Sequence, residues 1–226
     1  MNEIPHRKFI KKYENKDFIN SPLVEIPKET GIIVDMQYPK LGMKEAIDDC
    51  LVRKEVLDKL IRAKKYLPKG YTFKIWDAYR PLELQKELYY TYKDKIIKDF
   101  KHENLSKEKQ KELINKYVSF PDKNEQLPPL HSTGGAIDLT ITNEKTGKDL
   151  DMGIGFDDFS PLAHTDAFEK DGMDKTIRDN RRLLYNSMTK AGFTNLSSEV
   201  WHYDYGDRAW AFYTKNPAKY KGIFKK

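Results

Sequence analysis

Leu130–Ile141 reads LHSTGGAIDLTI, and this stretch has the alternation of a β-strand. Side chains of a strand point to opposite faces in turn, so Ile137, Leu139 and Ile141 share one face while Asp138 lies on the other. The apolar face predicts a strand of the core. Since a buried carboxylate without a partner is costly, the face that carries Asp138 must meet water or bind something.

Helical and strand patterns are mixed along the rest of the chain, with no regular strand–helix–strand repeat. Strands are predicted in TGIIVDMQY (30–38), YTFKIWD (71–77) and FTNLSSEVWHYDY (193–205). Helices are predicted over 52–67, from Pro81 onward, over 105–118 and over 173–191. Gly192 ends the last of these helices. This mixture predicts an α+β fold. We expect a single domain over residues 1–226, with a small, mostly antiparallel sheet packed by helices and with residues 1–30 and 215–226 peripheral.

The composition is polar but foldable, and it argues against several classes of partner. Of the 226 residues, 38% are hydrophobic and 34% charged, and the net charge of +6 comes mostly from dispersed lysines, with clusters at 8–12 and 215–226. No nucleic-acid motif accompanies these charges, so we expect solvated surface and no nucleic-acid partner. The single cysteine, Cys50, excludes an internal disulfide and a multi-cysteine zinc site, and its surroundings predict an ordinary helix residue.

The apolar segments are short, which predicts no membrane partner. No apolar run approaches the ~20 residues that span a bilayer. The first residues, MNEIPHRKFIKKYENKD, lack the apolar centre of a signal peptide, so we expect a cytoplasmic location.

Two of the five histidines, His131 and His202, lie in segments dense with aromatic residues, glycines and apolar strands. Taken alone, His202 fits a structural histidine, and Asp138 fits a turn cap or the partner of a lysine. Together the three residues make a ligand set suited to a zinc ion with an open fourth position. Glu199, three residues before His202, could accept a proton from a zinc-activated water. Strict alternation in VWHYDY (200–205) would put Glu199 and His202 on opposite faces, unless Glu199 precedes the strand or a bulge re-aims it.

These motifs resemble those of the VanX-type D-alanyl-D-alanine dipeptidases, zinc peptidases related to the VanY-type carboxypeptidases and to the zinc-bearing domain of hedgehog proteins. The family pattern is S-x-H-x-x-G-x-A-x-D followed far downstream by E-x-x-H, and HSTGGAID (131–138) and EVWH (199–202) supply it here. The resemblance implies that His131, Asp138 and His202 bind one Zn²⁺ per chain on the sheet face. It also implies that Glu199 is the general base.

Further segments carry the resemblance and imply roles in binding the substrate. WDAYRP (76–81) is similar to the segment whose arginine, here Arg80, lies beside the scissile carbonyl, with Asp77 as a partner or orienter. DMQY (35–38) and MGIGFDDF (152–159) resemble the segments that bring a tyrosine and an aspartate, here Tyr38 and Asp157, to the substrate's amine. RDNRRLLYNSMTKAGF (178–193) is similar to the helix that follows. Without the resemblance, Arg80 also fits a structural ion-pair residue, and Asp157 could merely shape its loop.

The resemblance implies a zinc-dependent enzyme of cell-wall metabolism that hydrolyses the D-alanyl-D-alanine dipeptide. The chain departs from the family at Pro129, which stands where a serine commonly lies two residues before the first histidine. Proline offers neither a hydroxyl nor an amide N–H, so the dipeptide preference stays open. Two alternatives also stay open: a D,D-carboxypeptidase or endopeptidase on peptidoglycan stem peptides, and a non-catalytic zinc-binding recognition module.

Overall fold

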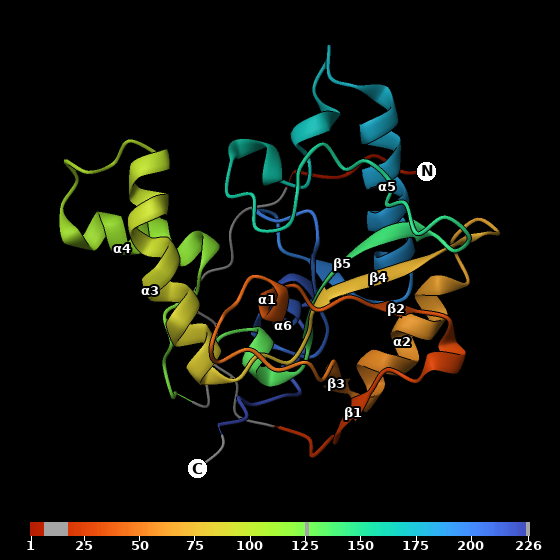
Figure 1. The fold of residues 1–226 in the computed structure, drawn as a ribbon, viewed down its shortest axis with the longest axis horizontal. Coiled ribbons are helices and arrows are strands. Elements are labelled where there is room, and N and C mark those ends of the chain that lie inside the picture. Colours follow the sequence, from red (N-terminus) through yellow and green to blue (C-terminus); the bar gives the residue numbers. More distant parts are fainter. Residues whose placement is uncertain (7–17, 125–126, 225–226) are drawn as a thin grey trace.

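The computed structural model describes residues 1–6, 18–124 and 127–224, and a five-stranded sheet lies at its centre (Figure 1). The strand order is β2 (Ile33–Val34), β4 (Tyr71–Asp77), β5 (Ala136–Asn143), β7 (His202–Asp204) and β6 (Thr194–Asn195). β2 pairs with β4 in parallel, and all other neighbours are antiparallel. Two more strands, β1 (Leu23–Glu25) and β3 (Leu51–Arg53), form a separate antiparallel pair. The predicted α+β fold with a small, mostly antiparallel sheet is confirmed.

The strand β5 is buried on both of its faces. Ile137, Leu139 and Ile141 have no exposed surface, as their alternation predicts. Asp138 and Thr140, on the opposite face, are only 2% and 1% exposed. Asp138 is therefore a buried carboxylate, for which the structure must supply partners.

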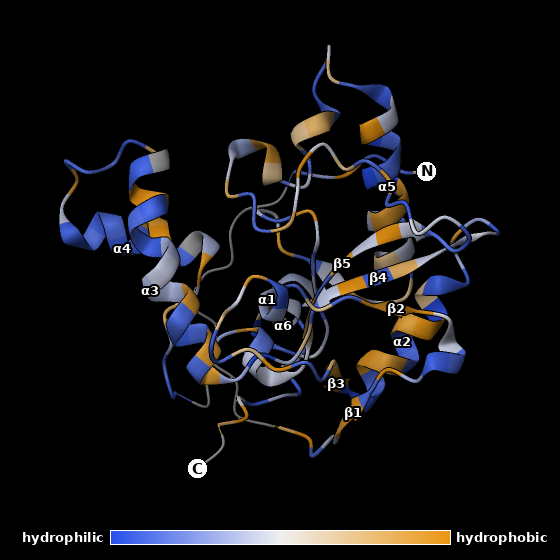
Figure 2. Cartoon of the chain, viewed as in Figure 1, coloured by the Kyte–Doolittle hydropathy of each residue, from blue (hydrophilic) through white to orange (hydrophobic). Residues whose placement is uncertain are grey.

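Two amphipathic helices, α2 (Lys54–Lys64) and α5 (Lys175–Lys190), cover the apolar face of the sheet (Figures 1 and 2). The side chain of Asp174 caps α5 by accepting from two backbone N–H groups, and Gly192 follows the helix with a φ of 101° that favours glycine. Both helices contribute to one hydrophobic cluster with the sheet, through Val56, Leu60, Leu184 and Met188.

The helices α3 (Leu82–Asp99) and α4 (Lys107–Tyr117) form a hairpin that is set apart from α2 and α5 (Figure 1). Ser106 caps α4 by accepting from the N–H of Lys109, as predicted. The hairpin has its own hydrophobic cluster, which includes Leu84, Leu88, Ile96, Leu113 and Ile114. The α3–α4 hairpin forms a wall opposite the sheet, and a cavity lies between the two.

Four local predictions were wrong, each because tertiary contacts overrode a local pattern. The predicted strand 30–38 is limited to β2 and is followed by α1 (Gln37–Lys40), which carries Tyr38. The predicted helix 52–67 is shorter and begins at Lys54, because Val52 lies in β3 and pairs with Val24 of β1. Cys50 is buried just before that strand and not in a helix. The predicted strand 193–205 is two strands, β6 and β7, because the chain reverses between them.

The remaining elements are short, and a segment near the C-terminus contributes to the core. They are η1 (Lys28–Thr30), η2 (His131–Thr133), η3 (Pro161–Ala163), η4 (Ala167–Glu169) and α6 (Arg208–Thr214). Ala218 and Tyr220, in a segment predicted to be peripheral, belong to the main hydrophobic cluster. The lysine cluster at 8–12 lies outside the described residues. None of the helices in the described ranges is both long and apolar enough to cross a membrane.

Candidate active site

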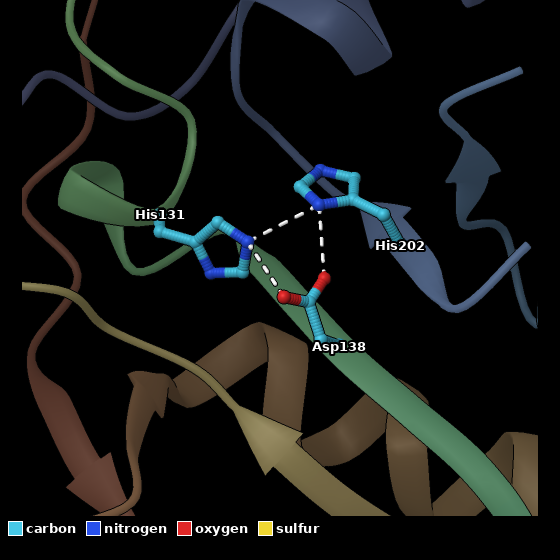
Figure 3. A group of neighbouring side chains, drawn as sticks. All are labelled: His131, Asp138 and His202. Carbon is cyan, nitrogen blue, oxygen red and sulfur yellow. Dashed lines mark hydrogen bonds and ion pairs between the residues drawn. The ribbon is translucent and has the colours of Figure 1, made fainter. Parts of the chain in front are cut away.

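Three polar residues lie side by side at one level of the sheet. The strand register pairs Asp77 of β4 with Asp138 of β5, and Asp138 in turn with His202 of β7. His131 joins them from η2, the turn that leads into β5 (Figure 3). The sheet thus brings together residues that are separated by up to 125 positions in the sequence, the span between Asp77 and His202.

His131, Asp138 and His202 point their ligand atoms at one another (Figure 3). His131 Nε2 lies 3.1 Å from His202 Nδ1 and 3.3 Å from Asp138 Oδ2, and His202 Nδ1 lies 3.0 Å from Asp138 Oδ1. Tetrahedral ligands that are about 2.1 Å from a zinc ion lie roughly 3.4 Å from one another. The two ring nitrogens and the Asp138 carboxylate therefore lie close to the spacing that one metal ion requires.

Outer contacts orient both imidazole rings toward this point. His131 Nδ1 lies 2.7 Å from the carbonyl oxygen of Ala78, which can only accept, so Nδ1 carries the proton and Nε2 keeps its lone pair. His202 Nε2 lies 2.9 Å from Asp204 Oδ1, which leaves its Nδ1 lone pair free in the neutral ring. Asp138 Oδ1 faces His202 Nδ1 but makes no well-aligned hydrogen bond among the described residues. Three acceptor atoms that face one another fit a cation between them.

Glu199 lies beside this triad but outside its closest atoms. It precedes β7, in a turn in which the N–H of His202 donates to the Glu199 carbonyl, and this removes the conflict with strand alternation. Its Oε2 lies 3.7 Å from His202 Nδ1. Burial raises the pKa of Glu199 to about 8 in the metal-free chain, with Asp138 and Asp157 adding to the shift and His202 opposing it. A cation at the triad would lower this pKa and favour the carboxylate.

Arg80 is buried and held by a network of acceptors. Its Nε and Nη2 donate to Asp77 Oδ2 at 2.9 and 2.7 Å, its Nη1 to Gln85 Oε1 at 2.9 Å, and its Nη2 also to the Tyr38 hydroxyl at 3.1 Å. Arg80 Nη2 lies 3.7 Å from Asp138 Oδ2, next to the triad. Asp77 thus holds the Arg80 guanidinium and does not line the cavity.

Asp157 carries a carboxylate oxygen that the chain leaves unpaired. Its Oδ2 is buried and has no hydrogen-bond partner among the described residues, and its backbone φ of 53° is unusual for a residue other than glycine. Burial raises the pKa of Asp157 to about 7, while Arg80 opposes this shift. The buried Arg181 fastens both ends of the Asp157 loop by donating to carbonyl oxygens of Met152, Leu162 and His164.

One cavity of about 440 Å³ connects these groups. Its floor is the triad with Glu199, and the α3–α4 hairpin with the segment after it forms the opposite wall. All predicted site residues except Asp77 line it: Tyr38, Arg80, His131, Asp138, Asp157, Glu199 and His202. Sequence reasoning missed three polar residues that hold or line the site, because nothing in their local sequence marks them: Gln85, Tyr92 and Arg181. It also assigned no role to Asp204, although strand alternation places Asp204 on the same face as His202.

The sequence of this chain also matches a family of known enzymes. The model of peptidase family M15, described as D-Ala-D-Ala dipeptidase, matches residues 40–221. The chain belongs to this family. The predicted family and the predicted enzyme class, a metallopeptidase, are thereby confirmed, while the roles of individual M15 site residues in this chain remain predictions.

Individual relatives agree with the family match. A D-alanyl-D-alanine dipeptidase of Synechocystis is 29% identical over 178 residues, which cover 72% of each chain. The enzyme of the same name from Enterococcus faecium is 30% identical over 154 residues, or 66% of this M15 chain and 70% of the relative. Among solved structures, a mutant of the vancomycin resistance D,D-pentapeptidase VanY in complex with Zn(II) is 15% identical to this chain, with a TM-score of 0.39. The match covers 80% of this chain and 82% of the VanY chain.

Proposed function

We propose that this M15 chain is a zinc-dependent dipeptidase that hydrolyses D-alanyl-D-alanine. The observation that carries the proposal is the convergence of three buried acceptor atoms from His131, Asp138 and His202, with the Glu199 carboxyl beside them. The two nitrogen ligands and one oxygen ligand suit Zn²⁺. Zinc held there would polarise a peptide carbonyl and lower the pKa of water toward ~7.

Glu199 is the proposed general base. It lies next to the triad without being one of the three facing ligands, so its carboxylate can accept the proton of the attacking water. The same carboxyl can then return this proton to the nitrogen of the leaving amine, which departs as a neutral amine.

Arg80 is proposed to stabilise the negative charge that develops on the carbonyl oxygen. Four hydrogen bonds to Asp77, Gln85 and Tyr38 use four of the five guanidinium N–H groups and leave one, on Nη1, for the substrate. Because these acceptors already hold the side chain, Arg80 needs no reorganisation during the reaction.

Asp157 and Tyr38 are proposed to bind the free amine of the dipeptide. A buried carboxylate oxygen without a donor is costly in the empty site, and an ammonium group supplies both the charge and the hydrogen bond that it lacks. This feature favours a dipeptidase over a carboxypeptidase or endopeptidase, since those enzymes would place a neutral peptide group at this position.

The proposal is tested with the zinc-loaded chain and its metal-site variants. We expect about one zinc per chain by metal analysis, release of D-alanine from D-alanyl-D-alanine, and lower zinc content for His131→Ala, Asp138→Ala and His202→Ala. Full zinc retention by all three variants would refute the metal site. Zinc binding without hydrolysis of any D,D-peptide would instead leave a recognition module.

A further inference from the structure

A free dipeptide has two charged ends, and the groups described so far account for only one of them. Asp157 and Tyr38 face the ammonium, and Arg80 faces the scissile carbonyl. The carboxylate at the other end needs a cationic or N–H partner, because a buried carboxylate without one is costly. The need for this partner rests on the proposed function.

The order of the strands places the two ends of the substrate on opposite sides of the triad. Tyr38 follows β2 and Arg80 follows β4, and Asp157 interacts with both side chains, so the amine-binding pair Asp157 and Tyr38 lies on the β2–β4 side of β5. On the other side, β7 leads into α6, whose first residue, Arg208, also lines the cavity. The triad, whose residues come from η2, β5 and β7, lies between these two sides.

Arg208 has guanidinium donors that no described residue engages. Its Nε donates to the carbonyl oxygen of Pro128 at 3.1 Å, and no ion pair or further hydrogen bond engages it within the part of the chain that the structure describes. Asp204 and Asp207 lie nearby and interact with each other, but neither forms an ion pair with Arg208 among the described residues, since Asp204 Oδ1 contacts His202 and Asp207 Oδ1 caps α6. Burial lowers the pKa of Arg208, while Asp207 and Asp204 favour its charged form. A partly desolvated cation without a paired carboxylate favours an anionic ligand.

The cavity wall next to Arg208 offers no other cationic partner for the substrate carboxylate among the described residues. Pro129 lines the cavity beside the carbonyl that Arg208 contacts, and it has neither a hydroxyl nor an N–H. The other cavity-lining cation apart from Arg80 is Lys111, which is exposed on α4 with its Nζ over the Phe120 ring. We propose that Arg208 binds the C-terminal carboxylate of the peptide substrate.

The test compares the free acid with its amide, using the full zinc-loaded chain. D-alanyl-D-alanine and D-alanyl-D-alanine amide differ in the terminal charge and share the scissile bond. We expect the unmodified enzyme to prefer the acid by ~10–100-fold in kcat/KM. Arg208→Met should remove most of this preference by raising KM for the acid, with kcat/KM for the amide changed less than about threefold. Arg208→Lys should restore part of the preference, because it restores the charge without the planar donors.

Lys111→Met is the matched control, since it removes a positive charge from the same cavity. The acid-to-amide preference should survive in Lys111→Met. Equal losses for both substrates in Arg208→Met would show that Arg208 only supports the 128–130 segment, and the proposal would be overturned. It would also be overturned if the unmodified enzyme hydrolysed acid and amide equally well, a result that needs no variant. A zinc-loaded chain that hydrolyses neither compound would instead refute the proposed function, which distinguishes the two failures.

Discussion

His202 Nε2 lies 2.9 Å from Asp204 Oδ1, and both residues belong to the strand β7. Residues two apart in a strand share a face, so the strand itself holds the carboxylate against the ring. This contact directs the other nitrogen, Nδ1, toward Asp138 and His131. Asp204 therefore controls which nitrogen of His202 is available to a metal, although it contacts no substrate.

Replacing Asp204 by alanine should weaken zinc binding by ~10–100-fold, because the ring of His202 loses the acceptor that fixes its tautomer. The measurement is competition for zinc against a chelator of known affinity. Asp171→Ala, an exposed change of the same type, is the control and should bind zinc like the unmodified chain. Unchanged affinity in Asp204→Ala would assign this contact to packing alone.

Glu199→Gln should separate metal binding from chemistry. The amide keeps the size of the side chain but cannot accept the proton of water, so kcat should fall by ~10²–10⁴-fold. Metal analysis should still find about one zinc per chain, because Glu199 is not among the three facing ligands. Glu29→Gln, on the exposed surface of η1, controls for the change of charge. Near-normal turnover of the zinc-loaded Glu199→Gln variant would contradict the role of Glu199.

Arg80→Lys should be far from conservative. An ammonium group offers three donors from one point and cannot reproduce the planar contacts to Asp77, Gln85 and Tyr38. We expect kcat to fall by ~10²-fold and KM to rise much less, since the lost donor acts mainly on the transition state. Arg62→Lys, on the exposed side of α2, is the control. A lower melting temperature with unchanged kinetics would make Arg80 a structural residue only.

How far the sequence leads depends on whether an interaction is local. The alternation around Asp138 and the two histidine motifs predict the core strand and the triad, because strand periodicity and ligand spacing are local properties. The pairing of Asp77 with Asp138 and of Asp138 with His202 depends on register between distant strands, which no single segment encodes. Gln85 could not be found for the same reason, since its amide becomes a partner of Arg80 only after α3 packs beside β4.

Asp157 should make the metal-free chain less stable as the pH rises. Burial raises its pKa to about 7 in the folded state, whereas the unfolded state has a pKa of about 4. The folded state therefore retains a proton that the unfolded state has released, and stability is lost between about pH 4 and pH 7. Asp157→Asn removes this effect. We expect the free energy of unfolding of Asp157→Asn, measured in urea relative to the unmodified chain, to rise from pH 5 to pH 8 by on the order of 2–3 kcal/mol. A gain that is the same at both pH values would show that Asp157 ionises in the fold as it does in water.

The choice between a dipeptidase and a carboxypeptidase depends on the amine of the substrate. If Asp157 and Tyr38 hold a free ammonium, then N-acetyl-D-alanyl-D-alanine loses a charge-assisted hydrogen bond and leaves Asp157 Oδ2 buried without a donor. Such a loss costs ~1.5–3 kcal/mol, and the stranded charge adds to it. The acetylated dipeptide and longer stem peptides should therefore be cleaved at least ~10–100-fold less efficiently than the free dipeptide.

Asp157→Ala provides the discriminating control for this difference. The variant should lower kcat/KM for the free dipeptide and leave that for the acetylated dipeptide nearly unchanged, because only the free amine uses Asp157. The gap between the two substrates should then narrow. If the unmodified enzyme cleaves acetylated or longer substrates as well as the free dipeptide, no ammonium site exists at Asp157. In that case its unpaired oxygen requires another explanation, and the carboxypeptidase alternative replaces the proposed function.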